Sequence, residues 1–195
     1  MIYKRDTRQR GFSLVETLVA ITIVLIVIVG PMTIVSTASR STTFSGEQVT
    51  AFFLAQEGAE LAQKARDNLV LEDFDDSGGS WEDFNDPGGE FAPCFSSGFG
   101  CGLQVDNRGV VDVRDCASSA NACRLYLDSS EGPIIPYSHD SAIATSTPYT
   151  RTIEFEEINS NEIRVVSRVE WFSGLARDGQ SVQVQTSLFN VYDPS

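Results

Sequence analysis

The sequence predicts an α+β fold in which one long N-terminal helix packs on a C-terminal antiparallel β-sheet. Three observations predict it: a long apolar run over residues 11–35, a helical repeat of small residues over 51–69, and three alternating stretches in the last third of the chain. Apolar residues spaced by three or four positions form one face of a helix, whereas strict alternation is typical of a strand with one buried face. Each element therefore has an apolar face, and the two faces can cover each other.

The chain begins with a basic leader, residues 1–11. Four of its residues are basic and one is acidic, namely Lys4, Arg5, Arg8 and Arg10 against Asp6. Because Lys and Arg are retained on the cytoplasmic side of a membrane, we expect the N-terminus in the cytoplasm and everything after about Val35 outside it. The whole chain has a net charge of -13. Such an acidic exported domain is a poor candidate for nucleic-acid binding by phosphate neutralisation.

The apolar run extends from Gly11 to Val35 and contains a single charged residue, Glu16. About 20 apolar residues suffice to cross a bilayer as a helix, and the apolar part of a secretory signal peptide is usually only about 7 to 15 residues long. We therefore expect residues 12–35 to form one membrane-spanning helix. Proline removes a backbone donor, so Gly30 and Pro31 predict a kink or a locally melted turn.

Glu16 is costly in such a helix. A carboxylate near the centre of a membrane costs on the order of 2.5–3.5 kcal/mol and usually faces a partner instead of lipid. If the chain is cut between Gly11 and Phe12, the new amine of Phe12 lies about one helical turn from Glu16. In a bundle of identical helices, that amine can neutralise the Glu16 carboxylate of a neighbouring chain. Assembly then satisfies both charges.

The residues Gly11–Glu16, which read GFSLVE, follow the basic leader and precede the apolar helix. They resemble the processing motif of type IV prepilins and pseudopilins. The resemblance implies that a prepilin peptidase cuts after Gly11 and methylates the amine of Phe12. It further implies that Glu16 guides assembly with other pilin subunits, driven by a pilus assembly machinery. We therefore expect a structural subunit, a minor pilin or a pseudopilin, and not an enzyme. It would lie first in the cytoplasmic membrane as a single-pass protein and then in an extracytoplasmic pilus or pseudopilus.

Two alternatives use the same apolar run differently. Ser36, Thr37 and Ala38 are small residues of the kind that a conventional signal peptidase accepts, so the domain could be secreted. An uncut run would be a plain anchor. In either case the protein would be a membrane-anchored or secreted binding or adhesion module that is not assembled into a filament.

Residues 36–69 are expected to continue the helix as an amphipathic segment. Small or apolar residues recur at intervals of three and four along it. They are Ala51, Ala55, Gly58, Ala62, Ala65 and Leu69. Small residues allow a sheet to approach closely, and Phe52, Phe53, Leu54 and Leu61 are expected to widen the apolar face. Residues 70–195 then form the extracytoplasmic domain.

The stretch 72–90 is acidic and rich in glycine. Six of its residues could offer oxygen ligands to calcium: Asp73, Asp75, Asp76, Asp83, Asn85 and Asp86. The EF-hand loop requires Glu at its twelfth position, and counting from Asp73 that position is Phe84. We therefore expect a solvated acidic loop, with no metal and no other cofactor.

Four cysteines follow: Cys94, Cys101, Cys116 and Cys123. Disulfides suit an exported domain, and a zinc site is poorly supported because no Cys-x-x-Cys pair occurs and the chain has one histidine. Four cysteines allow three connectivities. The second pair repeats the first with an offset of 22 positions, and each pair precedes a short strand with Leu on one face. This repeat favours two small loops within 94–123, each closed by its own cysteines.

The last third of the chain predicts three strands, at Tyr149–Ile158, Glu162–Phe172 and Val182–Tyr192. Short polar or glycine-bearing segments separate them, which predicts an antiparallel meander over residues 149–192. The apolar face of this meander would bury the stripe of small residues from Ala51 to Leu69 on the helix. That arrangement is similar to the pilin fold. His139, Asp140 and Ser141 are adjacent in sequence, but adjacency is no evidence of a catalytic triad, and we expect no catalytic site.

Overall fold

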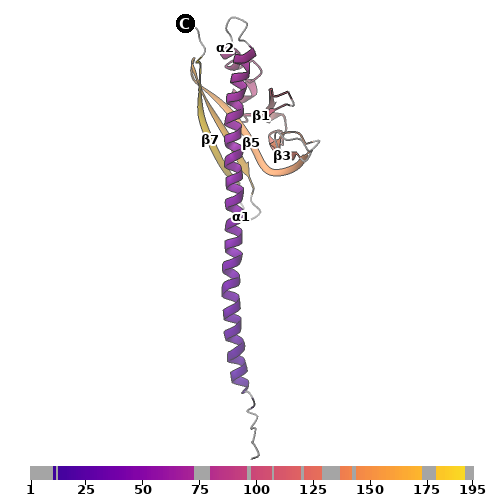
Figure 1. Ribbon diagram of the computed structural model, residues 1–195, viewed down its shortest axis with the longest axis vertical. Coiled ribbons are helices and arrows are strands. Elements are labelled where there is room, and N and C mark those ends of the chain that lie inside the picture. Colours follow the sequence, from indigo (N-terminus) through magenta and orange to yellow (C-terminus); the bar gives the residue numbers. More distant parts are fainter. Residues whose placement is uncertain are drawn as a thin grey trace, which may run out of the picture. The chain divides into compact units, whose positions relative to one another are not determined.

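The computed structural model describes residues 11, 13–72, 80–95, 98–106, 108–119, 121–128, 137–141, 144–172 and 179–191 of the chain. It contains one long N-terminal helix, α1 (Leu14–Glu72), and a C-terminal antiparallel sheet, so the predicted α+β, pilin-like class is confirmed (Figure 1). The chain divides into two compact units, Met1–Phe44 and Ser45–Ser195. The second unit also has a short helix, α2 (Ser80–Phe84), and two 3₁₀ turns, η2 (Ala92–Phe95) and η3 (Cys116–Ser118).

Within the described residues the sheet has seven strands. They are β1 (Cys101–Val105), β2 (Val111–Asp115), β3 (Arg124–Asp128), β4 (Tyr137–Ser138), β5 (Ala144–Asn159), β6 (Glu162–Trp171) and β7 (Gln180–Phe189). The pairs β5–β6 and β6–β7 form the meander expected from the alternating pattern. The other edge of β5 pairs with β3 and, further along, with β1, while β4 and β2 lie outside these two strands.

β5 begins five residues before the predicted strand, at Ala144. Pro148 lies in this extension, and it has no N–H to donate to a ladder. The β3–β5 register shifts at this point, between Arg124 and Tyr126. The Thr147 hydroxyl donates to the Leu125 carbonyl at 2.6 Å and supplies a bond inside the shifted stretch. A proline is therefore accommodated at an irregularity of the ladder.

Both disulfides close short loops at one end of the β1–β2 hairpin. The structure joins Cys94 to Cys101 and Cys116 to Cys123, which is the pairing that the 22-residue offset favours. The Cys116 N–H donates to the Gly100 carbonyl at 3.3 Å, so the two loops lie side by side. Gly100 has a φ of 63°, and a Cβ there would lie 2.7 Å from the Ile153 carbonyl oxygen. Only glycine fits this close approach of the first loop to β5.

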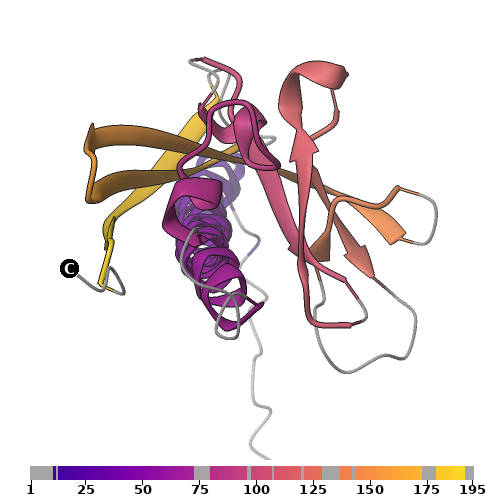
Figure 2. The ribbon, with the colours of Figure 1, turned by 90° about the horizontal axis from the view of Figure 1, so that it is seen from above.

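The core forms where residues 51–69 of α1 lie against the sheet, which curves around this part of the helix (Figure 2). Five stripe residues are buried and Leu69 is half-buried. One core cluster combines the end of α1 with aromatic residues, among them Trp81, Phe84 and Phe155. The other combines the stripe around Ala51 with Tyr149 and Trp171. The helix therefore joins two halves of one sheet.

The expectation that Phe52 and Phe53 widen the buried face is wrong. Their side chains are 46% and 62% exposed, whereas Leu54 and Leu61 are buried as expected. One residue turns a helix by about 100°, so positions 52 and 53 lie about 100° and 200° from Ala51. The sheet covers a sector of the helix surface that is too narrow to include these two positions.

Gly58 lies where the helix and sheet approach most closely. A Cβ at this position would overlap the Ser167 hydroxyl and lie 3.0 Å from Cδ of Arg151. Arg151 is fully buried, a site where Arg almost never occurs unpaired. Its guanidinium donates to Glu57 at 3.0 Å and to the carbonyls of Leu54 and Leu103 at 3.2 and 3.0 Å. Burial lowers the pKa of Arg151, and Glu57 opposes that shift.

Gly58→Ala should destabilise the fold although alanine favours helices. The added methyl group meets Ser167 and Arg151, and overpacking of this kind costs about 1–3 kcal/mol. Gly46→Ala is the matched control, since nothing lies within 4 Å of its added Cβ, and it should stabilise the same helix by about 0.5–1 kcal/mol. Thermal unfolding of the full chain in detergent micelles measures both changes. Equal effects of the two substitutions would refute close packing at Gly58.

Glu57→Gln should also lower the stability of the domain. It removes the carboxylate that neutralises buried Arg151, which we expect to cost about 1–3 kcal/mol. Glu60→Gln is the control, because Glu60 is exposed on the same helix and its carboxylate contacts Gln56. That change should stay within about 0.5 kcal/mol. If urea unfolding shows the same loss for both variants, the Glu57–Arg151 pair has no special role.

Candidate functional site

The candidate site is the start of α1. The helix begins at Leu14, where the Thr17 N–H donates to the Ser13 carbonyl at 3.1 Å and the Thr17 hydroxyl donates to Leu14 at 2.8 Å. Gly11 is exposed and precedes the helix. Phe12, the predicted methylated residue, lies outside the described residues, as does the leader at 1–10. The predicted cut after Gly11 therefore falls ahead of the regular helix.

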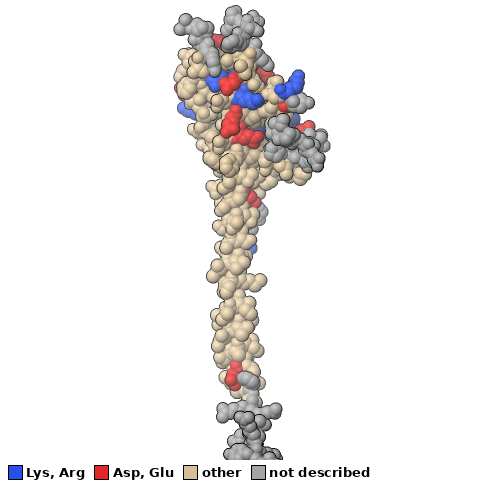
Figure 3. Space-filling model, viewed as in Figure 1, with Lys and Arg blue, Asp and Glu red and all other residues tan. Residues whose placement is uncertain are grey.

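Glu16 lies in the first turn of α1 and is exposed. A negative charge is favourable there because it faces the positive end of the helix dipole, although this contributes only about 0.3–1 kcal/mol. Glu16 is the only charged residue from Gly11 to Ser39. Figure 3 shows the first part of α1 as an almost uninterrupted uncharged surface with acidic atoms near its start. In an apolar environment this carboxylate requires a partner.

The large apolar side chains between Leu14 and Val35 are all at least half exposed, from 51% to 76%. No residue of the described chain covers them. Soluble monomers rarely expose a continuous apolar surface of this extent, so lipid or another protein must cover it. By length and composition, α1 is the one helix among the described residues that could cross a membrane.

The threonines of this segment satisfy their own hydroxyl groups. Thr22, Thr33 and Thr37 donate to carbonyls three or four residues earlier, at 2.7 to 3.1 Å. Such bonds matter in a bilayer, where no water replaces them. The threonine hydroxyls can therefore enter an apolar environment at little cost. Glu16 has no such partner within its own helix among the described bonds.

α1 continues through Gly30 and Pro31 without a break. The structure therefore has no locally melted turn at this point, and the kink stays a prediction. The Thr33 hydroxyl donates to the Gly30 carbonyl at 2.7 Å and supports the turn beside the proline. Ser36, Thr37 and Ala38, which are the candidate signal-peptidase residues, also lie within this helix.

The described hydrogen bond of the His139 ring differs from that of a catalytic triad. The His139 ring is buried, and its Nδ1 lies 3.1 Å from the backbone carbonyl of Arg124. In a triad that nitrogen would bond to a carboxylate. Asp140 instead uses its backbone N–H to contact the Ser138 hydroxyl at 3.2 Å.

Of the six candidate calcium ligands, Asp73, Asp75 and Asp76 lie outside the described residues, which omit 73–79, whereas Asp83, Asn85 and Asp86 lie within them. Asp86 is described, and its carboxylate accepts the Gly88 N–H at 2.8 Å in a local turn. In the part of the chain that the structure describes, no group of three or more His, Cys, Asp or Glu residues is placed to hold a metal ion.

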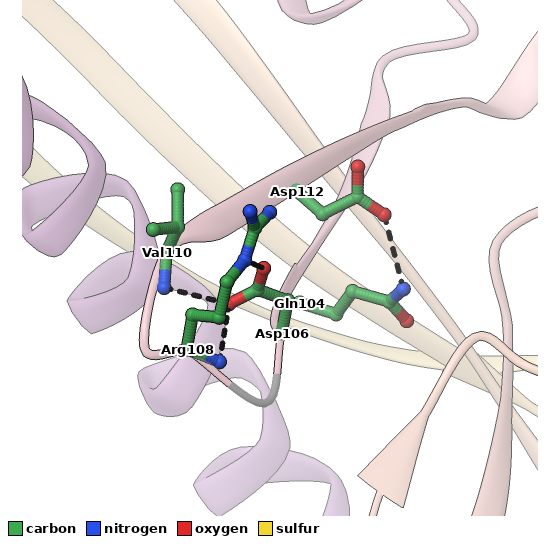
Figure 4. A network of polar contacts seen from close by, with 5 residues as sticks. All are labelled: Gln104, Asp106, Arg108, Val110 and Asp112. Atoms are coloured by element: carbon green, nitrogen blue, oxygen red, sulfur yellow. Dashed lines mark hydrogen bonds and ion pairs between the residues drawn. The ribbon is translucent and has the colours of Figure 1, made fainter.

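One polar cluster was not predicted from the sequence. Asp106 closes the β1–β2 hairpin by accepting the Arg108 and Val110 N–H groups at 2.8 and 2.9 Å and the Arg108 guanidinium at 2.8 Å (Figure 4). The Arg108 side chain holds the pKa of Asp106 below its usual value. The signal was an Asp three residues before Gly109, whose φ of 87° is typical of a turn. This cluster shapes a loop and offers no reactive group.

Comparison with known proteins supports the N-terminal site. Residues 6–30 match the family profile described as the prokaryotic N-terminal methylation motif. No curated protein and no solved structure matches the chain. The matched residues include the end of the leader, Gly11, Phe12, Glu16 and the apolar helix as far as Gly30. The chain therefore carries the signature of type IV pilins and pseudopilins, followed by an α+β domain of pilin-like architecture.

Proposed function

We propose that the protein is a structural subunit, a minor pilin or a pseudopilin, which is processed by a prepilin peptidase and polymerised into an extracytoplasmic filament. One observation carries the proposal: the methylation motif is followed by an apolar helix whose whole circumference is exposed and whose single charge is Glu16. Such a helix needs lipid before assembly and other helices afterwards.

Processing creates the positive charge that pairs with Glu16 during assembly. The basic leader holds the N-terminus in the cytoplasm, where the peptidase removes residues 1–11 and methylates the amine of Phe12. The bond after Gly11 lies ahead of α1, which begins at Leu14. A methylated amine keeps its positive charge, and it becomes the partner for a carboxylate.

Assembly then pairs the Phe12 amine of one subunit with Glu16 of its neighbour. The two residues are separated by four positions, or about 6 Å along a helix axis. A neighbouring helix displaced by about one turn therefore brings its amine level with this carboxylate. Both charges are costly in lipid when alone, and their pairing favours the packed state over the separate membrane-inserted state.

The rest of the chain follows from this placement. The unit 45–195 is displayed outside the cytoplasm, where its two disulfides persist. Gly30 and Pro31 supply a point at which the packed helix can bend. The partners are the prepilin peptidase, other pilin subunits, the pilus assembly machinery and the membrane. The acidic charge argues against a nucleic-acid partner.

A secreted or simply anchored binding module would have a different mature N-terminus. Conventional secretion would require cleavage near Ala38, and residues 36–38 lie inside α1. Peptidases bind substrates as extended chains, so this site would have to unwind first. The helical state of 36–38 therefore favours processing at Gly11.

The first test is the mature N-terminus. Mass spectrometry of the chain from a host with the peptidase should find N-methylated Phe12. In a host without the peptidase, Met1 or its processed equivalent should remain, together with the leader. A mature chain that starts at Ser39 would indicate secretion, and an uncut chain in the presence of the peptidase would indicate a plain anchor. Either result contradicts the proposal.

The second test removes the assembly charge. Glu16→Ala should leave cleavage and methylation intact but lower the amount of chain in sheared filaments by about tenfold or more, as expected for loss of at least about 1.4 kcal/mol of subunit interaction. Glu60→Ala removes an exposed carboxylate from the other unit and should assemble normally. Quantitative immunoblotting of filament and membrane fractions gives the ratio. Normal incorporation of Glu16→Ala would contradict this role of Glu16.

A further inference from the structure

The segment Tyr137–Ser141, here called the strap, is held to the edge of the sheet by one buried histidine. The strap contains β4, which is the outermost strand beside β3 and forms only two residue pairs with it. His139 adds hydrogen bonds to three other strands of the sheet. Its N–H donates to Gln104 of β1 at 2.9 Å, its carbonyl accepts from Arg114 of β2 at 3.0 Å, and its ring bonds to the carbonyl of Arg124 in β3.

The hydrogen bonds determine which ring nitrogen carries the proton. The Arg124 carbonyl can only accept, so Nδ1 must be the donor, and Nε2 is the basic nitrogen of the neutral ring. Nε2 is buried and has no hydrogen-bond partner among the described residues. It faces Gly102, where a Cβ would lie 2.8 Å away. A proton on Nε2 would therefore create a buried N–H without an acceptor, which costs free energy.

The charges around the ring also oppose protonation. Arg151 of β5 and Arg114 of β2 lie near it, and both act against a second positive charge. Glu57 of α1 is bound to Arg151, and Asp112 of β2 is bound to Gln104. Asp140 follows His139 on the strap itself. Burial first, and then Arg151, lower the pKa of His139 from 6.5 to about 4, while the bond to Arg124 opposes this shift.

We propose that the strap is an acid-released latch: it is closed while the His139 ring is neutral, and it detaches locally from β1 and β3 when that ring is protonated. Release frees the outer edge of β3 at Tyr126 and Leu127, which pair with Ser138 and Tyr137 in the closed state. An exposed strand edge is a pairing surface. Acid outside the cell therefore changes which surface this domain presents.

The opening is local because the domain is held together mainly by contacts outside the strap, of which Tyr137 alone packs on the cluster around Tyr149 and Trp171. The β5–β6–β7 meander pairs along ten residues on each side of β6, and both disulfides lie outside the strap. α1 packs on β5 and β6 through its own stripe. Breaking the contacts of His139 therefore costs one edge of the sheet and leaves the meander and α1 in place.

The pH dependence follows from the direction of the shift. The closed strap binds the proton less well than the open strap, so the neutral ring stabilises closure fully above about pH 6.5, and this stabilisation is lost as the pH falls toward 4. With a closed-state pKa of about 4 and an open-state pKa of about 6.5, the open fraction should rise about 30-fold between pH 7.5 and pH 5.

Hydrogen exchange of the full chain in detergent micelles tests the latch. After correction for intrinsic exchange rates, amide protection in residues 137–141 should fall about 30-fold from pH 7.5 to pH 5, while protection of β6 stays constant. His139→Asn keeps a donor near the position of Nδ1 and does not titrate, so its strap protection should change less than about twofold over this range. Gly102→Ala displaces the ring and should open the strap at both pH values.

Because His139 is the only histidine, one ¹³C-labelled ring signal reports its titration directly. In the unmodified chain the loss of strap protection should begin near pH 6.5, above the titration midpoint of the ring, and level off below that midpoint. The latch is overturned if the ring titrates without loss of protection. It is equally overturned if His139→Asn opens in acid as the unmodified chain does, since carboxylates would then drive the change. Should His139→Asn open the strap already at pH 7.5, the unmodified chain decides, because strap protection that does not begin to fall near pH 6.5 contradicts the latch.

Discussion

The close approach of α1 to the sheet at Gly58 is the constraint on which the folded domain depends. The small side chains of the stripe let the helix backbone come near β5 and β6, and Gly58 lies directly against Ser167 and Arg151. This proximity allows the guanidinium of Arg151 to reach Glu57 and the Leu54 carbonyl of the helix together with the Leu103 carbonyl of β1. A larger residue would separate these groups. Helix, meander and hairpin are therefore joined at one point.

Two side chains that can carry a positive charge are buried in this region. One of them is charged and the other is neutral. Arg151 stays charged because a carboxylate and two carbonyls surround it. His139 stays neutral because Nε2 has no acceptor in the described chain and Arg151 and Arg114 repel a second charge. The permanent charge of Arg151 thus helps to keep the histidine neutral. Arg151 links α1 to the sheet through paired contacts, whereas His139 is the residue that we propose makes the sheet edge sensitive to pH.

The two units of the chain differ in where their apolar side chains lie. In unit 45–195 the apolar side chains turn inward and form two packed clusters. From Leu14 to Ser39 every described side chain is exposed, and the threonine hydroxyls bond to their own helix. That segment suits an environment without water, with Glu16 as its one unsatisfied charge. We propose that filament assembly gives the Glu16 charge a partner, since each subunit supplies both an acceptor carboxylate and a donor amine.

Local patterns in the sequence determined much of this protein. A helix face repeats every 3.6 residues and a strand face every two, so spacing alone predicted the stripe from Ala51 to Leu69 and the three strands of the meander. The methylation motif is also a continuous stretch that sequence can show without structure.

Only the tertiary structure decided the features that join distant segments. Arg151 occupies an inward position in an alternating strand, and its burial depends on carbonyls 97 and 48 residues away. The exposure of Phe52 and Phe53 depends on how much of α1 the sheet covers. The Ser- and Thr-rich sequence around His139 gave no local sign that this residue is buried. The reason is that its hydrogen-bond partners come from three other strands. Periodicity reports which face of an element is apolar, whereas the contacts that satisfy a buried charge are set by the packing of the whole domain.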